Sequence, residues 1–368
     1  MRYRRLPIEI ESPEQMGYEN LRCNLTESSR SDAPLGELAR GLEDLALGYG
    51  DHAGLPRLRA LVAQGEGLTA ADVLATPGAA AALFIAATSL LKEGDRMLVA
   101  RPNYATNIET PRALGCRVDF LDLTHENGWR VDPAEVERLM TPETRLVSLT
   151  CPHNPTGASM SEADLRRIVA AVEARGARLI FDETYRDMTF GAALPMAASL
   201  SPSAISVSSL SKTYGLPGIR AGWLACRDRD LMETFLAAKE QILICGSILD
   251  EELAARALES RAARLPAIRA DVRARFEVVR DWMGGERRLE WVEPQGGVVC
   301  FPRIKASSGV DAERFYRALN ETHGTFVGPG HWFEMDRRHF RLGYGWPKLD
   351  ELRGGLESIS VALSAART

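Results

Sequence analysis

Short apolar runs alternate with helical patterns through the middle of the chain. Most of these runs are apolar at consecutive positions, as strands are when helices cover both faces of their sheet. The runs predict strands at Val73–Thr76, Arg96–Ala100, Arg117–Leu121, Leu146–Thr150, Arg178–Phe181, Ala204–Val207 and Ala221–Cys226. The patterns between them predict helices at Ala79–Leu91, Thr106–Leu114, Pro133–Met140 and Glu162–Arg175. This alternation predicts an α/β fold with a mostly parallel sheet.

Two of these helices have clear start signals. Asp132 is followed by Pro133, and proline is favoured at the first position of a helix. Ser161 stands three residues before Asp164, a spacing that resembles a capping box. Both helices are therefore expected to begin at these points.

The pattern changes to long helical stretches after the predicted sheet. Helices are predicted over Asp228–Ile244 and Leu249–Met283, with a break at Pro266 because proline removes a helical hydrogen bond. The C-terminal part mixes strands at Leu289–Val292, Gly297–Pro302 and Phe340–Leu342 with helices at Asp311–Thr322 and Leu349–Ala365. We therefore predict a large domain at residues 48–245, and a smaller α+β domain formed by residues 1–47 and 246–368.

Composition and charge exclude several classes of function. The net charge of −5 over 368 residues gives no electrostatic case for binding nucleic acid or an anionic membrane surface. The apolar runs are shorter than the ~20 residues that span a bilayer. The six cysteines have irregular spacings with no Cys-x-x-Cys pair, and the six histidines lack metal-ligand spacing. We expect a cytoplasmic protein without a metal site or a disulfide framework.

The most informative motif runs from Ser208 to Arg220, directly after a predicted buried strand. Burial at the end of a strand would lower the pKa of Lys212 and make its amine a nucleophile toward carbonyl groups. Ser209 and Ser211 can donate hydrogen bonds to a phosphate, and Arg220 can bind one through two parallel bonds. The alternative is a surface turn with a solvated lysine, which the length of the motif disfavours.

This stretch resembles the cofactor-lysine signature of the class I/II aminotransferases, which are fold type I enzymes of pyridoxal 5′-phosphate (PLP). The resemblance extends from about Tyr49 to Gly343. It implies a large PLP-binding domain with a seven-stranded sheet, and a Schiff base between PLP and Lys212. The implied reaction moves an amino group from an L-amino acid to a 2-oxo acid, with Lys212 as general base and then general acid.

The motifs around Asn154 and Asp182 extend the resemblance. Asn154-Pro155-Thr156-Gly157 ends a strand and resembles the family's Asn-Pro-x-Gly motif, which implies that Asn154 contacts the phenolic oxygen of PLP and the substrate. Asp182 ends the next strand, and the resemblance implies that it keeps the ring nitrogen of PLP protonated. Tyr185 would donate to the phenolic oxygen from the other side, and Glu183 is interpreted as structural. A plain turn at Asn154 and a helix N-cap at Asp182 are the alternatives.

Further cofactor contacts are implied near two other strand ends and before the large domain. The segment Gly78-Ala79-Ala80 opens a helix, whose backbone N–H groups would bind the PLP phosphate. Tyr104 would stack on the PLP ring, although it could instead be a core tyrosine. Tyr49 lies in an element that resembles Tyr-Gly-x-x-x-Gly and would reach the phosphate of the neighbouring subunit. This implies a homodimer with shared active sites.

The predicted substrate contacts lie at both ends of the chain. Arg341 stands between Phe340 and Leu342 on a predicted strand, and the resemblance implies that it binds the substrate α-carboxylate. An exposed arginine on a half-buried strand is the alternative. In the N-terminal segment, Glu27 could favour a basic substrate and Arg30 an acidic one, and both could be surface residues.

Other reactions remain open because a fold and a cofactor do not determine the chemistry. The same cofactor site supports β-elimination, α-decarboxylation, acyl condensation or oxygen-dependent oxidation of arginine-like substrates. A PLP-binding transcription regulator needs a DNA-binding domain, and the residues before Tyr49 show no helix-turn-helix pattern. A dehydrogenase is disfavoured because no Gly-x-Gly-x-x-Gly follows a strand.

Overall fold

The computed structural model describes residues 1–367 and contains one large sheet in the order β2-β8-β7-β6-β5-β3-β4. The five strands from β7 to β4 are parallel, and β8 runs antiparallel to both of its neighbours. The predicted mostly parallel sheet of seven strands is confirmed. Its strands are β2 (Val73–Pro77), β3 (Arg96–Arg101), β4 (Arg117–Asp122), β5 (Thr144–Thr150), β6 (Arg178–Asp182), β7 (Ala204–Ser209) and β8 (Ala221–Ala225).

Helices cover both faces of this sheet because alternate strand residues point to opposite sides. Leu98 of β3 belongs to one buried cluster with α6, α7 and α8, whereas Val99 belongs to another with α4, α5 and α9. The predicted starts are confirmed, since Asp132 accepts from the Ala134 N–H and Ser161 from the Asp164 N–H. The helices are α3 (Pro56–Ala63), α4 (Gly78–Leu90), α5 (Ala105–Leu114), α6 (Pro133–Leu139), α7 (Glu162–Ala174), α8 (Ala197–Leu200), α9 (Arg229–Leu243) and α10 (Ile248–Glu259).

A second sheet forms the core of the smaller domain, in the order β1-β12-β13-β10. Two of its strands, β1 (Cys23–Leu25) and β12 (Thr325–Pro329), are absent from the sequence prediction because β1 is short and β12 ends in turn-forming residues. The others are β10 (Val299–Cys300) and β13 (Phe340–Gly343), beside a separate pair of β9 (Leu289–Glu290) and β11 (Arg303–Ile304). The helices are α1 (Pro7–Glu11), α2 (Pro13–Met16), α11 (Arg261–Gly285), α12 (Ala312–Arg317) and α13 (Leu349–Ala365).

The predicted break at Pro266 is wrong. Helix α11 continues through Pro266, and the interruption lies at Ser260, between α10 and α11. Pro266 and Ala262 are both exposed, so water can reach the carbonyl group that the missing N–H leaves unbonded. Ile268 and Phe276, further along α11, are buried in the small-domain core and hold the helix in place. The predicted helix over Asp311–Thr322 is also shorter, since Ala318–Thr322 forms a π-helical turn.

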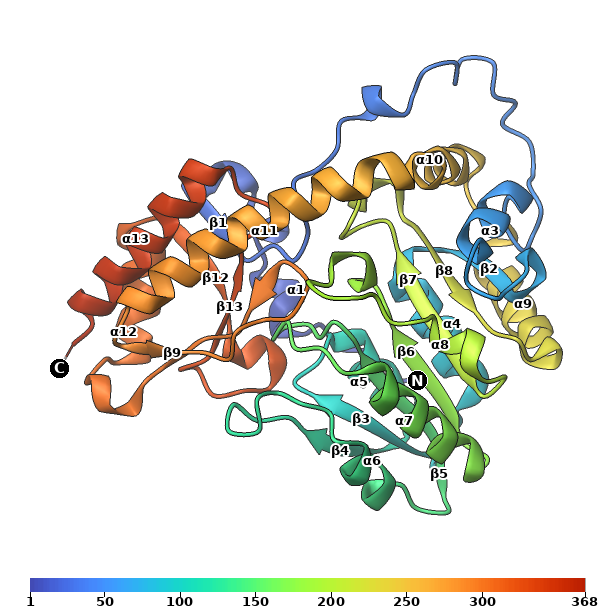
Figure 1. Cartoon of the computed structure of the whole chain (residues 1–368), viewed down its shortest axis with the longest axis horizontal. Coiled ribbons are helices and arrows are strands. Elements are labelled where there is room, and N and C mark those ends of the chain that lie inside the picture. The colour runs from blue at the N-terminus through green and yellow to red at the C-terminus, as the bar shows by residue number, and fades with distance from the viewer. Residues whose placement is uncertain (368) are drawn as a thin grey trace.

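Helices α10 and α11 connect the two sheets. Helix α10 packs against α3 and β8, and its Leu253 shares a buried cluster with Val73 of β2. From there α11 runs to the smaller domain, where it lies beside α13 (Figure 1). The domain division at residues 245 and 246 stays a prediction. Of the described helices, none combines the length and apolar composition needed to cross a bilayer.

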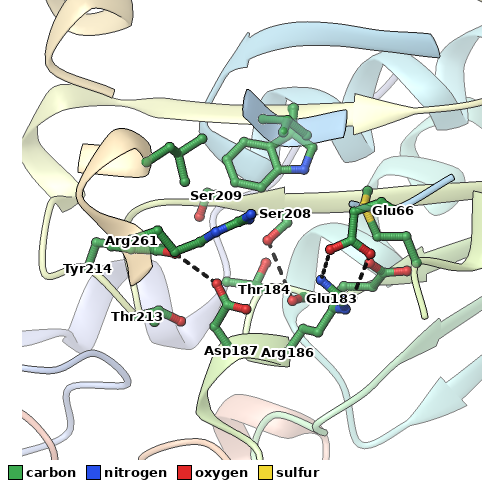
Figure 2. A pocket seen from close by; sticks show the side chains of 14 residues that line it. Glu66, Glu183, Thr184, Arg186, Asp187, Ser208, Ser209, Thr213, Tyr214 and Arg261 are labelled. Carbon is green, nitrogen blue, oxygen red and sulfur yellow. Dashed lines mark hydrogen bonds and ion pairs between the residues drawn. The ribbon is translucent and has the colours of Figure 1, made fainter. Parts of the chain in front are cut away.

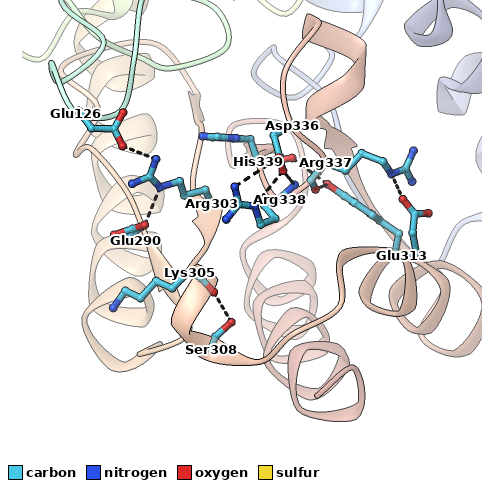
Figure 3. A network of polar contacts seen from close by, with 11 residues as sticks. Glu126, Glu290, Arg303, Lys305, Ser308, Glu313, Asp336, Arg337, Arg338 and His339 are labelled. Carbon is cyan, nitrogen blue, oxygen red and sulfur yellow. Dashed lines mark hydrogen bonds and ion pairs between the residues drawn. The ribbon is translucent and has the colours of Figure 1, made fainter. Parts of the chain in front are cut away.

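A polar network positions the loop that leads into β13 (Figure 3). Arg303 of β11 binds the carboxylates of Glu126 and Glu290, each at 2.7 Å. Its backbone pairs with His339 in an isolated bridge. His339 directly precedes β13, the strand that carries the buried Arg341. The network therefore connects the large domain to the strand that bears the predicted substrate arginine.

Candidate active site

Most of the predicted site residues line one cleft of about 400 Å³. The cleft lies where the carboxyl ends of β5, β6 and β7 face β13 and the N-terminal segment, the usual place for ligands in open α/β sheets. It brings together Ala79, Ala80, Tyr104, Asn154, Asp182, Tyr185, Ser209, Ser211, Lys212, Arg220 and Arg341.

Lys212 lies in the loop after β7, and its carbonyl oxygen accepts a hydrogen bond from the Arg30 N–H at 3.2 Å. Within residues 1–367, its Nζ atom makes no hydrogen bond or ion pair. Burial lowers the pKa of Lys212, while the nearby Glu27 carboxylate raises it. This amine is therefore closer to its neutral, nucleophilic form than a solvated lysine.

Asp182 is the last residue of β6 and lies in the same cleft as Lys212. Its Oδ1 atom accepts from the backbone N–H of Thr184 at 3.0 Å and from the Thr184 hydroxyl at 2.6 Å. Burial raises the pKa of Asp182, and the bonds from Thr184 and the charge of Lys212 oppose that rise. The carboxyl group can thus pair with a cationic ring nitrogen, whose charge would favour ionised Asp182.

The first turn of α4 can bind an anion. Its N-cap is Pro77, which provides no side-chain hydrogen bond, so the first N–H groups of the helix remain for a ligand. Gly78 has φ +76°, a conformation that other residues rarely adopt. The Ala79 and Ala80 side of this turn opens into the cleft.

Close contacts bring β8 and Arg220 to this helix end. A Cβ atom on Gly222 would lie 2.6 Å from the carbonyl carbon of Gly78, and a Cβ on Gly78 would lie 2.7 Å from Nη2 of Arg220. Ser209 and Ser211 also line the cleft. An open helix N-terminus, two hydroxyls and a guanidinium, packed around glycines, fit the phosphate of PLP.

Arg341 and Asn154 form the opposite side of the cleft. Nη1 of Arg341 donates to Oδ1 of Asn154 at 3.0 Å, and Nη2 donates to the carbonyl oxygen of Thr26 at 2.7 Å. Arg341 is only 5% exposed, and its Nε atom is buried without a hydrogen-bond partner. Burial lowers the pKa of Arg341. An orphaned N–H on a buried cation indicates a place for an anionic ligand.

Two tyrosines, Tyr104 and Tyr185, line the cleft and differ in how far they are buried. Tyr104 directly precedes α5 and is partly buried. The hydroxyl of Tyr185 donates to the carbonyl oxygen of Ser28 at 2.8 Å, and burial raises the pKa of Tyr185. A phenol has one proton to donate, so Tyr185 must leave Ser28 before it can donate to a ligand.

Tyr49 lies outside the cleft of its own chain. It precedes α3, and its side chain is 90% exposed. Nothing within the described chain tests the predicted contact with a second subunit. Gly50 lies against Ile248 of α10, since a Cβ on Gly50 would be 2.7 Å from the Ile248 side chain.

Glu183 faces a separate small cavity of about 30 Å³, next to Thr184 and Ser209 (Figure 2). Its carboxylate accepts from the Ser206 hydroxyl at 2.6 Å and from the Ala197 N–H at 2.7 Å. Burial raises the pKa of Glu183 to about 7. These bonds connect β6, β7 and α8, so they support the interpretation of Glu183 as structural.

The N-terminal segment contributes residues that sequence reasoning missed. Glu27 lines the cleft, whereas Arg30 is not among the lining residues. The missed residues share no motif or periodicity that marks them as site residues. They are Ile8, Ser12, Glu14, Tyr18, Ser28 and Asp32 in the N-terminal segment, joined by Trp332 and Trp346 from the C-terminal part of the chain.

Comparison with known proteins gives a consistent result. The family model for aminotransferase class I and II matches residues 30–359. Arginine–pyruvate transaminase of Pseudomonas aeruginosa is 31% identical over 329 residues, which cover 85% of this chain and 82% of the relative. Capreomycidine synthase of Streptomyces vinaceus is 31% identical over 332 residues, which cover 88% and 83%.

Two solved structures share the whole fold. A PLP-dependent aminotransferase from Streptococcus suis superimposes with a TM-score of 0.91 at 28% identity, covering 100% of both chains. A PLP-dependent cyclase superimposes with a TM-score of 0.89 at 27% identity, covering 99% of this chain and 98% of the other. The geometry of the cleft and these likenesses point to the same cofactor.

Proposed function

The chain belongs to the class I and II aminotransferase family and is a PLP-dependent aminotransferase, and we propose that Lys212 binds the cofactor covalently and transfers the proton. The observation that supports this most is the unpaired Nζ atom of Lys212 in one cleft with the buried carboxyl group of Asp182. When bound, PLP supplies an electron-accepting ring that makes the Cα–H bond of an attached amino acid acidic.

Several other residues of the cleft take the roles that the resemblance implies. The N–H groups of Ala79 and Ala80, with Arg220 and the hydroxyls of Ser209 and Ser211, bind the phosphate. Gly78 provides the tight approach that this contact needs.

Three further residues hold the ring. Asp182 would keep the ring nitrogen protonated, and Tyr104 would stack on the ring face. Asn154 uses its amide N–H₂ as a donor, because its Oδ1 atom already accepts from Arg341.

Arg341 binds the α-carboxylate of the substrate. The guanidinium has five N–H groups, and within the described chain two of them donate, to Asn154 and Thr26. The remaining three include the orphaned Nε–H and are enough for a two-bond fork to a carboxylate. With the carboxylate held there, Nζ of Lys212 can take the proton from the substrate Cα and return it.

We also propose that the active unit is a homodimer in the cytoplasm. Exposed apolar side chains gather near Tyr49, where the loop before α3 meets the turn between α9 and α10. These residues are Leu47, Tyr49, Ile242, Ile244 and Leu249. An exposed apolar patch of this kind is typical of an interface. A second subunit bound there would bring its Tyr49 toward the cofactor phosphate of the first subunit.

Replacing the lysine tests the assignment. The Lys212→Ala variant should lose the absorbance of covalently bound PLP and at least about a thousand-fold in turnover, because it lacks both the nucleophile and the base. Lys92→Ala is the matched control, since Lys92 is an exposed lysine outside the cleft. Transamination by the Lys212→Ala variant at the wild-type rate would rule out the assignment.

A second reaction deserves a parallel test because one relative is named a synthase and one similar structure a cyclase. Elimination at the substrate side chain would use the same lysine and the same cofactor. The two reactions differ in their products. Transamination requires a 2-oxo acid acceptor and releases no ammonia. Elimination needs no acceptor and releases the leaving group of the side chain as a separate product.

A further inference from the structure

Three carboxylates line the substrate end of the cleft without a basic partner. Glu14 lies on α2, and Glu27 and Asp32 follow β1. Within residues 1–367, none of the three lies within 4.0 Å of a lysine, arginine or histidine nitrogen. Glu27 and Asp32 instead accept from neutral donors, the Tyr18 hydroxyl at 3.0 Å and the Trp346 Nε1–H at 3.0 Å. This wall of the cleft therefore presents three carboxyl groups that lack a direct ion-pair partner.

The acidic wall lies close to the groups that handle the amino acid. Glu27 and Glu14 both raise the pKa of Lys212 and the pKa of Arg341 against the effect of burial. Burial and the neighbouring Glu14 raise the pKa of Glu27. A cation beside Glu27 would remove this repulsion and favour its ionised form. An amino acid held at Arg341 and Lys212 can thus direct a cationic side chain to these carboxylates.

Two aromatic rings provide a flat surface beside the carboxylates. Tyr18 and Trp346 stack with their centroids 5.8 Å apart and an interplanar angle of 19°. Their polar atoms bind Glu27 and Asp32, so the rings and the carboxylates are fixed relative to one another. A guanidinium is planar and weakly hydrated, stacks on aromatic faces and pairs with carboxylates through several N–H groups, whereas an ammonium is a strongly hydrated point charge.

We propose that the preferred amino donor carries a guanidinium on its side chain, bound by Glu27, Asp32 and Glu14. This inference rests on the proposed function, because Arg341 must hold the α-carboxylate. Arg341 is 5% exposed and its buried Nε has no partner, so the same cleft offers an anion-binding group for the α-carboxylate of such a donor. Of the two side-chain alternatives in the N-terminal segment, Glu27 lies in the cleft and Arg30 does not line it. The arrangement therefore favours a cationic donor over an acidic one.

The test compares L-arginine with L-citrulline, its neutral isostere, on the wild-type holoenzyme. The initial rate of the cofactor's spectral change is measured with each amino acid, first without an acceptor and then with a 2-oxo acid. Charged hydrogen bonds of this kind predict that kcat/KM for arginine exceeds that for citrulline by about ten- to a hundred-fold. Equal values for the two amino acids would overturn the proposal, and a higher value for L-lysine would overturn the choice of a guanidinium.

Variants connect the preference to the acidic wall. In the Glu27→Gln/Asp32→Asn double variant, the arginine-to-citrulline ratio should fall toward one, because amides retain the shape and lose the charge. Glu19→Gln is the matched control, since Glu19 is exposed in the same segment and does not line the cleft. A double variant that keeps the wild-type ratio would refute the role of these carboxylates. Failure of the proposed function looks different: alanine, citrulline, lysine and arginine would all leave the cofactor spectrum unchanged.

Discussion

Gly222→Ala should separate β8 from the first turn of α4 and weaken the proposed phosphate site. The new Cβ would lie 2.6 Å from the carbonyl carbon of Gly78 and 2.8 Å from the Ala79 nitrogen, and both are backbone atoms that cannot rotate away. To reach an ordinary 3.4 Å contact, the two elements must move apart by roughly 0.8 Å. Gly222 has no positive φ, so the backbone itself accepts alanine and the effect is purely one of space.

The expected cost has two parts. Overpacking of this kind destabilises a folded protein by about 1–3 kcal/mol. Displaced N–H groups at Ala79 and Ala80 would lose one charged hydrogen bond to the phosphate, which corresponds to about ten- to a hundred-fold weaker binding of PLP.

The assay is urea unfolding of the cofactor-free and cofactor-loaded forms, together with PLP retention during dialysis, followed by absorbance. Gly218→Ala is the control, because a Cβ there meets nothing within 4 Å. A Gly222→Ala protein that unfolds earlier but retains PLP as the wild type does would show that the start of α4 is not the phosphate site. A Gly222→Ala protein that unfolds at the same urea concentration as the wild type would refute the steric argument itself.

Two other substitutions test the subunit contact and the structural carboxyl group. Tyr49→Phe should speed the loss of PLP during dialysis and leave the dimer intact in sedimentation. Tyr3→Phe is the control, because Tyr3 is also exposed. Unchanged PLP retention in Tyr49→Phe would argue against a phosphate contact from Tyr49. Burial raises the pKa of Glu183 to about 7, so the folded state favours the protonated carboxyl group. As pH rises from about 4.5 to about 7, the free energy of unfolding of the wild type should therefore fall by about 3 kcal/mol relative to that of Glu183→Gln. A pH-independent difference in urea unfolding would contradict that origin.

The helices and strands of the large domain could be predicted because their signals are local. Apolar residues at consecutive positions mark β3 and β5 as strands buried on both faces, and the capping residues Asp132 and Ser161 mark helix starts within a few residues. The small-domain strands β1 and β12 carry weaker signals, because their pairing is between segments far apart in the chain. The predicted break at Pro266 was wrong because tertiary contacts also decide this point. The packing of the rest of α11 outweighs the one hydrogen bond that the proline removes.

The candidate site likewise contains residues that local motifs mark and residues that only tertiary packing places. Lys212, Asp182 and Asn154 stand in short motifs at the ends of strands, and parallel strands bring their carboxyl ends to one edge of the sheet, so the sequence alone determined that these residues meet. Glu14 lies on α2, a helix of four residues, and Asp32 lies in a loop, so neither segment is long enough to show a period that marks a buried face. Only the packing of the N-terminal segment decided that they line the cleft, because such a segment takes its position from distant contacts and not from its own residues.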